Sequence, residues 1–135
     1  PQCREAIHLT RLRAHRHKAI PWTRYVAHAE NQEIMKRVRI TVKRITEYRD
    51  LMAEYENPIE HTCDMRLGQT FIAEDCTKPD GMCDSAWETL YPFVKELTEG
   101  GGNFFDGWMK NPHSAMISCN DGFRPVSFYI EVIED

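Results

Sequence analysis

The strongest hydrophobic pattern in the chain lies in residues 86–97, where apolar side chains recur at spacings of three and four. The apolar positions are Ala86, Trp87, Leu90, Phe93, Val94 and Leu97. This spacing brings them onto one face of an amphipathic helix, while the intervening charged residues fall largely on the other face. We therefore predict a main helix over about residues 84–98 that packs this apolar face against the rest of the domain.

Residues at both ends of this segment match known helix boundary signals. Ser85 and Glu88 have the spacing of a capping box, in which each side chain bonds the backbone N–H of the other residue. Gly100 follows the last apolar position and permits the left-handed conformation that ends many helices. Pro92 lacks the amide hydrogen that a helix interior uses. We therefore predict a kink before Pro92 or a new first turn that starts there.

Period-two alternation predicts strands on both sides of the main helix. Val38, Ile40 and Val42 alternate with basic or polar residues, which is typical of a strand with one buried face. The predicted strands cover residues 36–45, 68–73, 115–119 and 124–133, and a shorter helix covers about residues 47–56. The Asn-Asp-Gly turn at residues 120–122 favours an antiparallel hairpin. Together these elements predict an α+β fold, in which a small antiparallel or mixed sheet of about four strands packs against the two helices.

The composition is that of a single globular domain. Hydrophobic residues make up 41% and charged residues 28% of the 135 residues, which is ordinary for a folded chain. No apolar run approaches the roughly 18 residues that a membrane span needs, so we expect no membrane association. The sequence begins at Pro1, and Met35 is the first methionine. We expect Met35 to be the natural start, with a single α+β domain over residues 35–135 and a poorly structured basic extension over residues 1–34.

Charge and cysteine content narrow the classes of partner and compartment. Residues 1–34 carry six Lys or Arg and three Glu, whereas residues 35–135 carry eleven Lys or Arg and eighteen Asp or Glu. An acidic body argues against a broad nucleic-acid surface. The five cysteines are an odd number and do not form a compact disulfide framework. They therefore favour a reducing cytoplasm, with thiols that are free or bound to metal.

Two further features are candidate binding sites. Phe104, Phe105 and Trp108 lie in a glycine-rich predicted loop and are too apolar to remain fully solvated there. They either fold back over the core or form an exposed patch for a ligand or partner, including a second copy of the chain. Arg124 could pair with an acidic ligand, or it could form a salt bridge with Asp121 or with the acidic loops.

Several short motifs, taken in order, resemble a family of small bacterial and archaeal proteins that has no assigned function. The motifs are Cys63-x-x-x-x-Gly68-Gln69-x-Phe71, Pro79-x-Gly81-x-Cys83-x-x-Ala86-Trp87 and Cys119-x-Asp121-Gly122-x-Arg124-Pro125-Val126. The resemblance covers residues 35–135 and implies a shared fold and a shared cysteine pattern, without implying a reaction. Members of this family often carry a second cysteine next to the one at position 119, where this chain has Ser118.

The resemblance singles out Cys63, Cys83 and Cys119, and three interpretations of them stay open. They are buried as small hydrophobic residues, or they bind zinc or an iron–sulfur cluster. In the third interpretation Cys83 is a reactive thiol, because a helix N-terminus stabilises a thiolate. All three cysteines lie at predicted element boundaries, which can meet in space.

A closed metal site usually has four protein ligands, and the sequence offers candidates for the fourth. These candidates are His61, Cys76 and His113. The sequence thus predicts a small cytoplasmic domain with a cysteine-centred metal, iron–sulfur or redox site. The alternative is a non-enzymatic binding or assembly module that uses the aromatic loop and a sheet edge.

Overall fold

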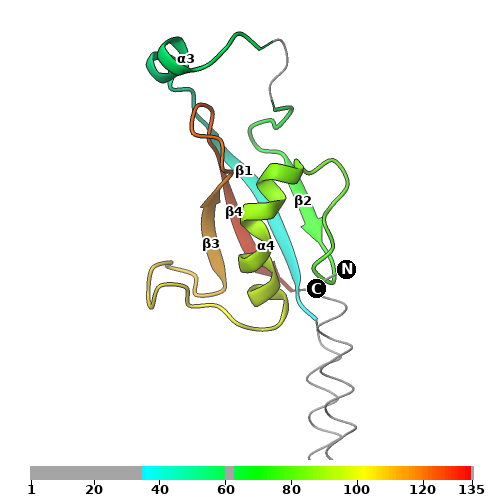
Figure 1. The fold of residues 1–135 in the computed structure, drawn as a ribbon. Helices are drawn as coiled ribbons and strands as arrows, with labels where there is room; N and C mark the ends of the chain where they lie inside the picture. Colours follow the sequence, from blue (N-terminus) through cyan, green and yellow to red (C-terminus); the bar gives the residue numbers. More distant parts are fainter. Residues whose placement is uncertain (1–34, 60–62, 135) are drawn as a thin grey trace, which may run out of the picture.

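A computed structural model describes residues 35–59 and 63–134 of the chain. The predictions for residues 1–34 and for His61 therefore lie outside the described residues. The described part contains strands β1 (Arg37–Ile45), β2 (Thr70–Ala73), β3 (Ser114–Ser118) and β4 (Val126–Ile133), with helices α3 (Arg49–Tyr55) and α4 (Asp84–Thr98) (Figure 1). Each predicted strand and helix is present, and their ends differ from prediction by a few residues.

The four strands form one antiparallel sheet in the order β2-β1-β4-β3. The predicted α+β class is confirmed, and so is the hairpin of β3 and β4, in which Ile117 pairs with Phe128. The centre of the sheet joins the two ends of the domain, because β1 pairs along its length with β4. In that pairing Ile40 lies opposite Ile130, and Val42 lies opposite Phe128.

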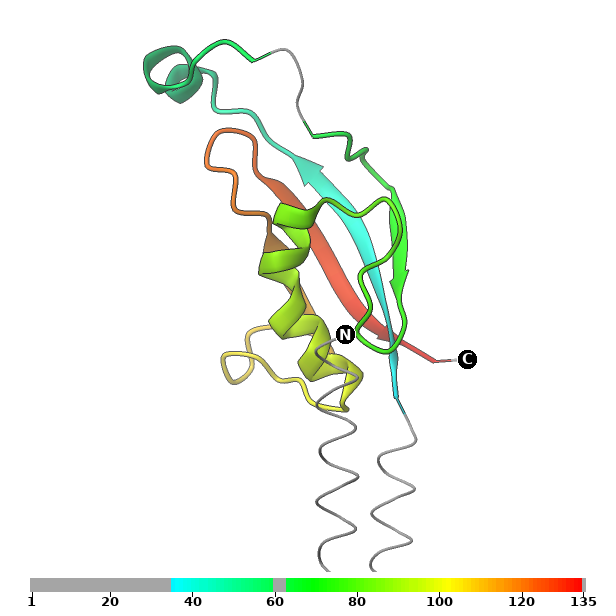
Figure 2. The ribbon, with the colours of Figure 1, turned by 45° about the vertical axis from the view of Figure 1, so that its right-hand side comes forward.

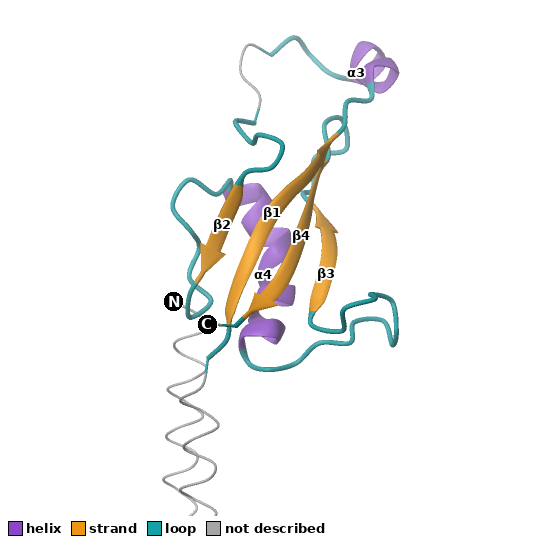
Figure 3. Ribbon diagram, turned by 180° about the vertical axis from the view of Figure 1, so that it is seen from behind, coloured by secondary structure: helices purple, strands orange, loops and turns teal. Residues whose placement is uncertain are grey.

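The core lies between α4 and one face of this sheet (Figure 2). Its fully buried side chains include Val38, Ile40 and Val42 of β1, Phe128 and Ile130 of β4, and Leu90, Val94 and Leu97 of α4. These are the positions that the two periodicities placed on buried faces. Seen from behind, the opposite face of the sheet has no helix of the described residues across it (Figure 3).

The start of α4 differs from the predicted capping box. Cys83 is the N-cap residue, and no side-chain hydrogen bond caps the helix. Ser85 lies within the first turn, and its hydroxyl donates to Asn120 Oδ1 in the turn between β3 and β4. The capping-box prediction is wrong because this tertiary contact takes up the serine side chain.

Helix α4 runs without interruption through Pro92, so no new first turn begins there, and the kink stays a prediction. Pro92 and Glu88 are both exposed. The Glu88 carbonyl, which loses its usual amide donor to the proline, therefore faces water, and this limits the cost of the missing bond. Gly100 ends the helix as predicted, with φ +93° and its N–H bonded to the Leu97 carbonyl.

Helix α3 forms as predicted but buries none of its residues. It lies beyond the end of β1, away from the face that α4 covers (Figure 1). Neither helix of the described residues has the length and apolar character that a bilayer span requires.

Replacing Leu90 by alanine should destabilise the domain strongly, because the side chain is fully buried between α4 and the sheet. We expect Leu90→Ala to lower the free energy of unfolding by about 3–5 kcal/mol. Leu67→Ala is the matched control, since Leu67 is 70% exposed, and should stay within about 0.5 kcal/mol of wild type. Urea denaturation followed by circular dichroism measures both. Equal losses in the two variants would contradict this packing.

Candidate functional site

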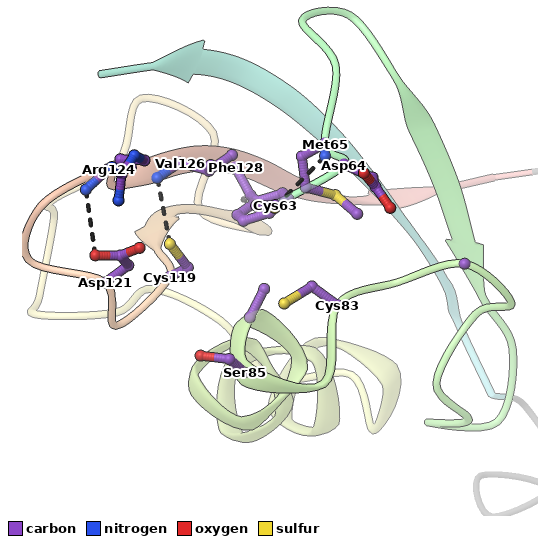
Figure 4. A pocket seen from close by; sticks show the side chains of 12 residues that line it. Cys63, Asp64, Met65, Cys83, Ser85, Cys119, Asp121, Arg124, Val126 and Phe128 are labelled. Atoms are coloured by element: carbon purple, nitrogen blue, oxygen red, sulfur yellow. Dashed lines mark hydrogen bonds between the residues drawn. The ribbon is translucent and has the colours of Figure 1, made fainter. Parts of the chain in front are cut away.

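Three free cysteines from three separate segments line one pocket. Cys63 precedes β2, Cys83 caps α4 and Cys119 follows β3 directly. The pocket has a volume of about 420 Å³. The side chains of the three cysteines approach this pocket from three sides (Figure 4). The sequence therefore identified residues that the fold brings together, although they are distant along the chain.

Cys119 is held firmly by the β3–β4 hairpin. Its N–H donates to the Val126 carbonyl at 3.0 Å, and its sulfur accepts the Val126 N–H at 3.3 Å. The neighbouring Ser118 carbonyl accepts the Thr89 hydroxyl at 3.1 Å, which joins this strand end to α4. The position of the Cys119 sulfur is thus set by backbone bonds on one side and by the helix on the other.

Cys63 lies in the loop before β2 and is the most exposed of the three. Its sulfur accepts the Met65 N–H at 3.4 Å. Burial in the pocket raises the pKa of this thiol, and the nearby Cys83 and Cys119 sulfurs raise it further, whereas the bond from Met65 acts in the opposite direction. The net effect is a raised pKa, so the Cys63 side chain is a neutral thiol at neutral pH.

Cys83 is placed by the tight turn that leads into α4. Gly81 in that turn has φ +82°, a conformation that strongly favours glycine. The Cys83 carbonyl accepts the Trp87 N–H at 2.9 Å, the first bond of the helix. Of the two other cysteines that line the pocket, Cys83 raises the pKa of Cys63 more than Cys119 does.

The rest of the pocket wall is apolar on one side and polar on the other. The apolar lining includes Met65, Ala86, Val126 and Phe128, and the polar lining includes Asp64, Ser85, Asp121 and Arg124. The Asp121 carboxylate accepts the backbone N–H groups of Phe123 at 2.8 Å and of Arg124 at 3.2 Å, which stabilises the turn. An apolar wall with a few convergent polar groups is typical of ligand sites.

Arg124 binds Glu56 rather than Asp121. Its two terminal nitrogens lie 2.8 Å from the two Glu56 oxygens, in a bidentate pair whose side chains are only 15% and 17% exposed. The hydrogen bonds to Glu56 raise the pKa of Arg124 above its ordinary value. The Asp121 alternative is therefore wrong, and an acidic side chain of this chain already occupies the guanidinium that was a candidate for ligand binding.

Two of the candidates for a fourth metal ligand, Cys76 and His113, do not line the pocket with the three cysteines, and the third, His61, lies outside the described residues. Cys76 is 1% exposed and disulfide-bonded, so the prediction of a free or metal-bound thiol is wrong for this residue. His113 precedes β3, at the end opposite Cys119, and its Nδ1 lies 3.4 Å from the Gly101 carbonyl. Among the described residues, no three His, Cys, Asp or Glu side chains are placed to hold a single metal ion.

The three aromatic residues of the loop do not behave alike: one folds back over the core, and two form an exposed patch. Phe104 packs edge-on against Phe93 of α4, with ring centroids 5.0 Å apart, and belongs to the core. Phe105 and Trp108 pack on each other, with centroids 5.2 Å apart, and are 74% and 44% exposed. The exposed patch therefore consists of this pair, and Phe104 is not part of it.

Comparison of the chain with protein-family models, with curated proteins and with solved structures finds no match. The family resemblance of residues 35–135 therefore stays a prediction. Functional arguments for this chain depend on the geometry of the cysteine pocket.

Sequence patterns did not indicate two contributors to the site. One is Glu56, which neutralises Arg124 from 68 residues away. The other is the backbone, since the N–H groups of Met65 and Val126 reach the cysteine sulfurs. Backbone donors carry no residue signature, and the Glu56 pair depends on a contact between distant loops.

Replacing Arg124 by glutamine should loosen the segment that carries α3. The Glu56 pair joins this segment to the β3–β4 turn, together with backbone bonds such as Tyr48 N–H to the Phe123 carbonyl at 2.9 Å. We expect faster amide hydrogen exchange over residues 46–56 in Arg124→Gln, with β1 and β4 still protected. Arg49→Gln is the control, because the Arg49–Glu47 pair is largely exposed. Unchanged exchange in Arg124→Gln would show that the pair does not hold this segment.

Proposed function

We propose that Cys63, Cys83 and Cys119 are the protein ligands of an iron–sulfur cluster in the pocket between α4 and the β3–β4 hairpin. The observation that carries this proposal is the convergence of three free thiols from three separate segments on one cavity. Cysteine thiolates are the usual ligands of such clusters. A cluster bound there would supply one-electron transfer, and an iron without a protein ligand would be open to a substrate.

The spread of the three thiols favours a cluster over a single ion. One zinc ion needs its donors within about 2.3 Å of a single point, and no three such side chains of the described residues are placed in that way. The cysteines instead surround a cavity of about 420 Å³. A polynuclear centre accepts ligands that lie on different sides of such a cavity, because each thiolate binds a different metal atom.

The hydrogen bonds of the sulfurs support the same proposal. Backbone N–H groups point at the sulfurs of Cys63 and Cys119. Such bonds stabilise a thiolate and are one of the factors that set the reduction potential of a cluster. Because the donors of these hydrogen bonds are backbone N–H groups, no polar side chain is needed, and the pocket keeps its apolar wall.

The proposal extends to the cellular compartment of the protein and to the kind of organism from which it comes. Three thiols that must stay reduced to bind a cluster suit a reducing cytoplasm, whereas the disulfide of Cys76 is more typical of an oxidising compartment. A bacterial or archaeal source is part of the same proposal and is supported only by the resemblance of the sequence motifs. The fourth coordination position would be open, or it would be filled by a carboxylate of the pocket wall such as Asp64 or Asp121.

Anaerobic reconstitution of the full chain with ferrous iron and sulfide tests the proposal. We expect wild type to bind iron and acid-labile sulfide in equal amounts and to gain visible absorption. Cys63→Ser, Cys83→Ser and Cys119→Ser should each lose most of the bound iron. Ser85→Ala is the control, because Ser85 lines the same pocket without a thiol, and it should bind as wild type does.

Elemental analysis separates the outcomes of this experiment. Zinc bound without sulfide would replace the cluster by a single-ion site. If wild type bound neither metal, or if the cysteine variants bound as much as wild type, the cysteine pocket would have no metal function.

A second candidate function is self-association through the aromatic loop. The specific observation is the exposed pair of Phe105 and Trp108, on a loop next to β3, which is an edge strand of the sheet. Exposed aromatic pairs and open strand edges are both common contact surfaces. We propose a second copy of this chain as the partner, since one edge strand can pair with another.

Light scattering coupled to size-exclusion chromatography tests this second function. We expect wild type to shift from monomer to dimer as its concentration rises, and the Phe105→Ser, Trp108→Ser double variant to stay monomeric. Leu67→Ser is the matched control, because Leu67 is 70% exposed but lies in the loop before β2. A wild-type protein that is monomeric throughout would end this candidate.

A further inference from the structure

We infer that Cys63 and Cys83 form a reversible disulfide that withdraws two of the three sulfurs from the pocket. The bond would make the site responsive to the thiol–disulfide balance around it. The regulatory consequence rests on the proposed cluster function, whereas the formation of the disulfide does not.

The location and exposure of the two thiols favour a disulfide between them. Both line the same pocket, and Cys83 raises the pKa of Cys63 more than Cys119, the third cysteine of the pocket, does. Cys63 is exposed and Cys83 is half-buried, so a small disulfide reagent can reach the pair from solvent. Two thiols that line one cavity, with one of them open to reagents, have what disulfide exchange requires.

The loop that carries Cys63 and the turn that carries Cys83 both lie outside regular secondary structure. A disulfide brings two sulfurs to about 2 Å from each other, so at least one backbone must move. Cys63 lies in the loop before β2, and Cys83 precedes the first residue of α4. Cys63 lies outside the strands and helices of the described residues, and its sulfur would give up the hydrogen bond from the Met65 N–H, 3.4 Å long, on approaching Cys83.

Cys119 is the thiol that this inference excludes from the bond. Its backbone N–H and its sulfur both bond Val126, directly after β3, whose residues Ser114–Ser118 all pair with β4. Moving its sulfur would break the end of that ladder. Cys119 should therefore stay a thiol while the other two oxidise.

The chemistry balances with a low-molecular-weight disulfide as the oxidant. One protein thiolate attacks a sulfur of the oxidant and releases one small thiol, which leaves a mixed disulfide on the protein. The second protein thiol then loses its proton and attacks the protein sulfur of that mixed disulfide. A second small thiol leaves, and the Cys63–Cys83 bond forms. Two protein thiols are oxidised while one small disulfide is reduced to two thiols.

The positions of aspartate make the bond easy to identify. Cleavage on the amino side of aspartate places Cys63 in residues 50–63, Cys83 in residues 80–83 and Cys119 in residues 106–120. Cys76 is in residues 75–79 and Cys3 is in residues 1–49. Each of the five cysteines therefore has a peptide of its own, and every disulfide gives a distinct mass.

The experiment treats the full metal-free chain with oxidised glutathione, blocks the remaining thiols and maps the peptides by mass spectrometry. We expect residues 50–63 linked to residues 80–83, with residues 106–120 blocked as a free thiol. Dithiothreitol should reverse the link. Cys119→Ser should keep it, and Cys63→Ser and Cys83→Ser should lose it. Circular dichroism of each variant checks that it folds.

Two outcomes would overturn the inference. One is a link from Cys83 or Cys63 to Cys119, and the other is glutathione left on either cysteine without a protein disulfide. The oxidised and the reduced chain are then both reconstituted with iron and sulfide. Loss of cluster uptake only in the oxidised chain supports the regulatory role. A disulfide that forms in a chain that never binds metal would refute the cluster and leave the dithiol pair standing.

Discussion

The antiparallel pairing of β1 with β4 is the interaction on which the rest of the fold depends. It runs from Arg37 opposite Ile133 to Ile45 opposite Val126, and joins the first and last strands of the described chain. Every other strand attaches to one of these two, and α4 covers the apolar side chains that they present. Because this contact is distant in sequence, closing it costs more chain entropy than forming the local hairpin of β3 and β4. The cysteine pocket is one product of that closure.

The pocket follows from how α4 crosses the central strands. The C-terminal end of α4 is tied to the start of β1, where the Lys36 N–H donates to the Thr98 carbonyl at 3.0 Å. Its N-terminal end therefore lies toward the β3–β4 turn, where Thr89 bonds the Ser118 carbonyl. Because the start of α4 lies near the end of β3, Cys83 and Cys119 line the same pocket. Cys63 joins them because β2 pairs with β1 on the other side of the helix.

Local periodicity was sufficient to predict the elements of this fold, and it was insufficient for the contacts between them. The buried faces of β1 and α4 could be read from spacing, because burial imposes a repeat on each element separately. The strand order could not be read, since β1 could pair with several partners that present the same alternation. The same reason explains the errors at single residues. Ser85 bonds Asn120 instead of capping its helix, and Arg124 bonds Glu56 instead of Asp121. Each choice was decided by a residue distant in sequence.

The alternation of β3 also decides on which face of the sheet Ser118, the neighbour of Cys119, lies. Cys119 and Ile117 pack against the core, whereas Ser118 between them is exposed. Successive side chains of a strand point to opposite faces of its sheet. A cysteine at position 118 would therefore point away from the face that bears the pocket. The serine in this chain costs the pocket no ligand, so a site built on Cys63, Cys83 and Cys119 would be complete without the adjacent thiol. A thiol pair at positions 118 and 119 would instead put one sulfur on each face of the sheet.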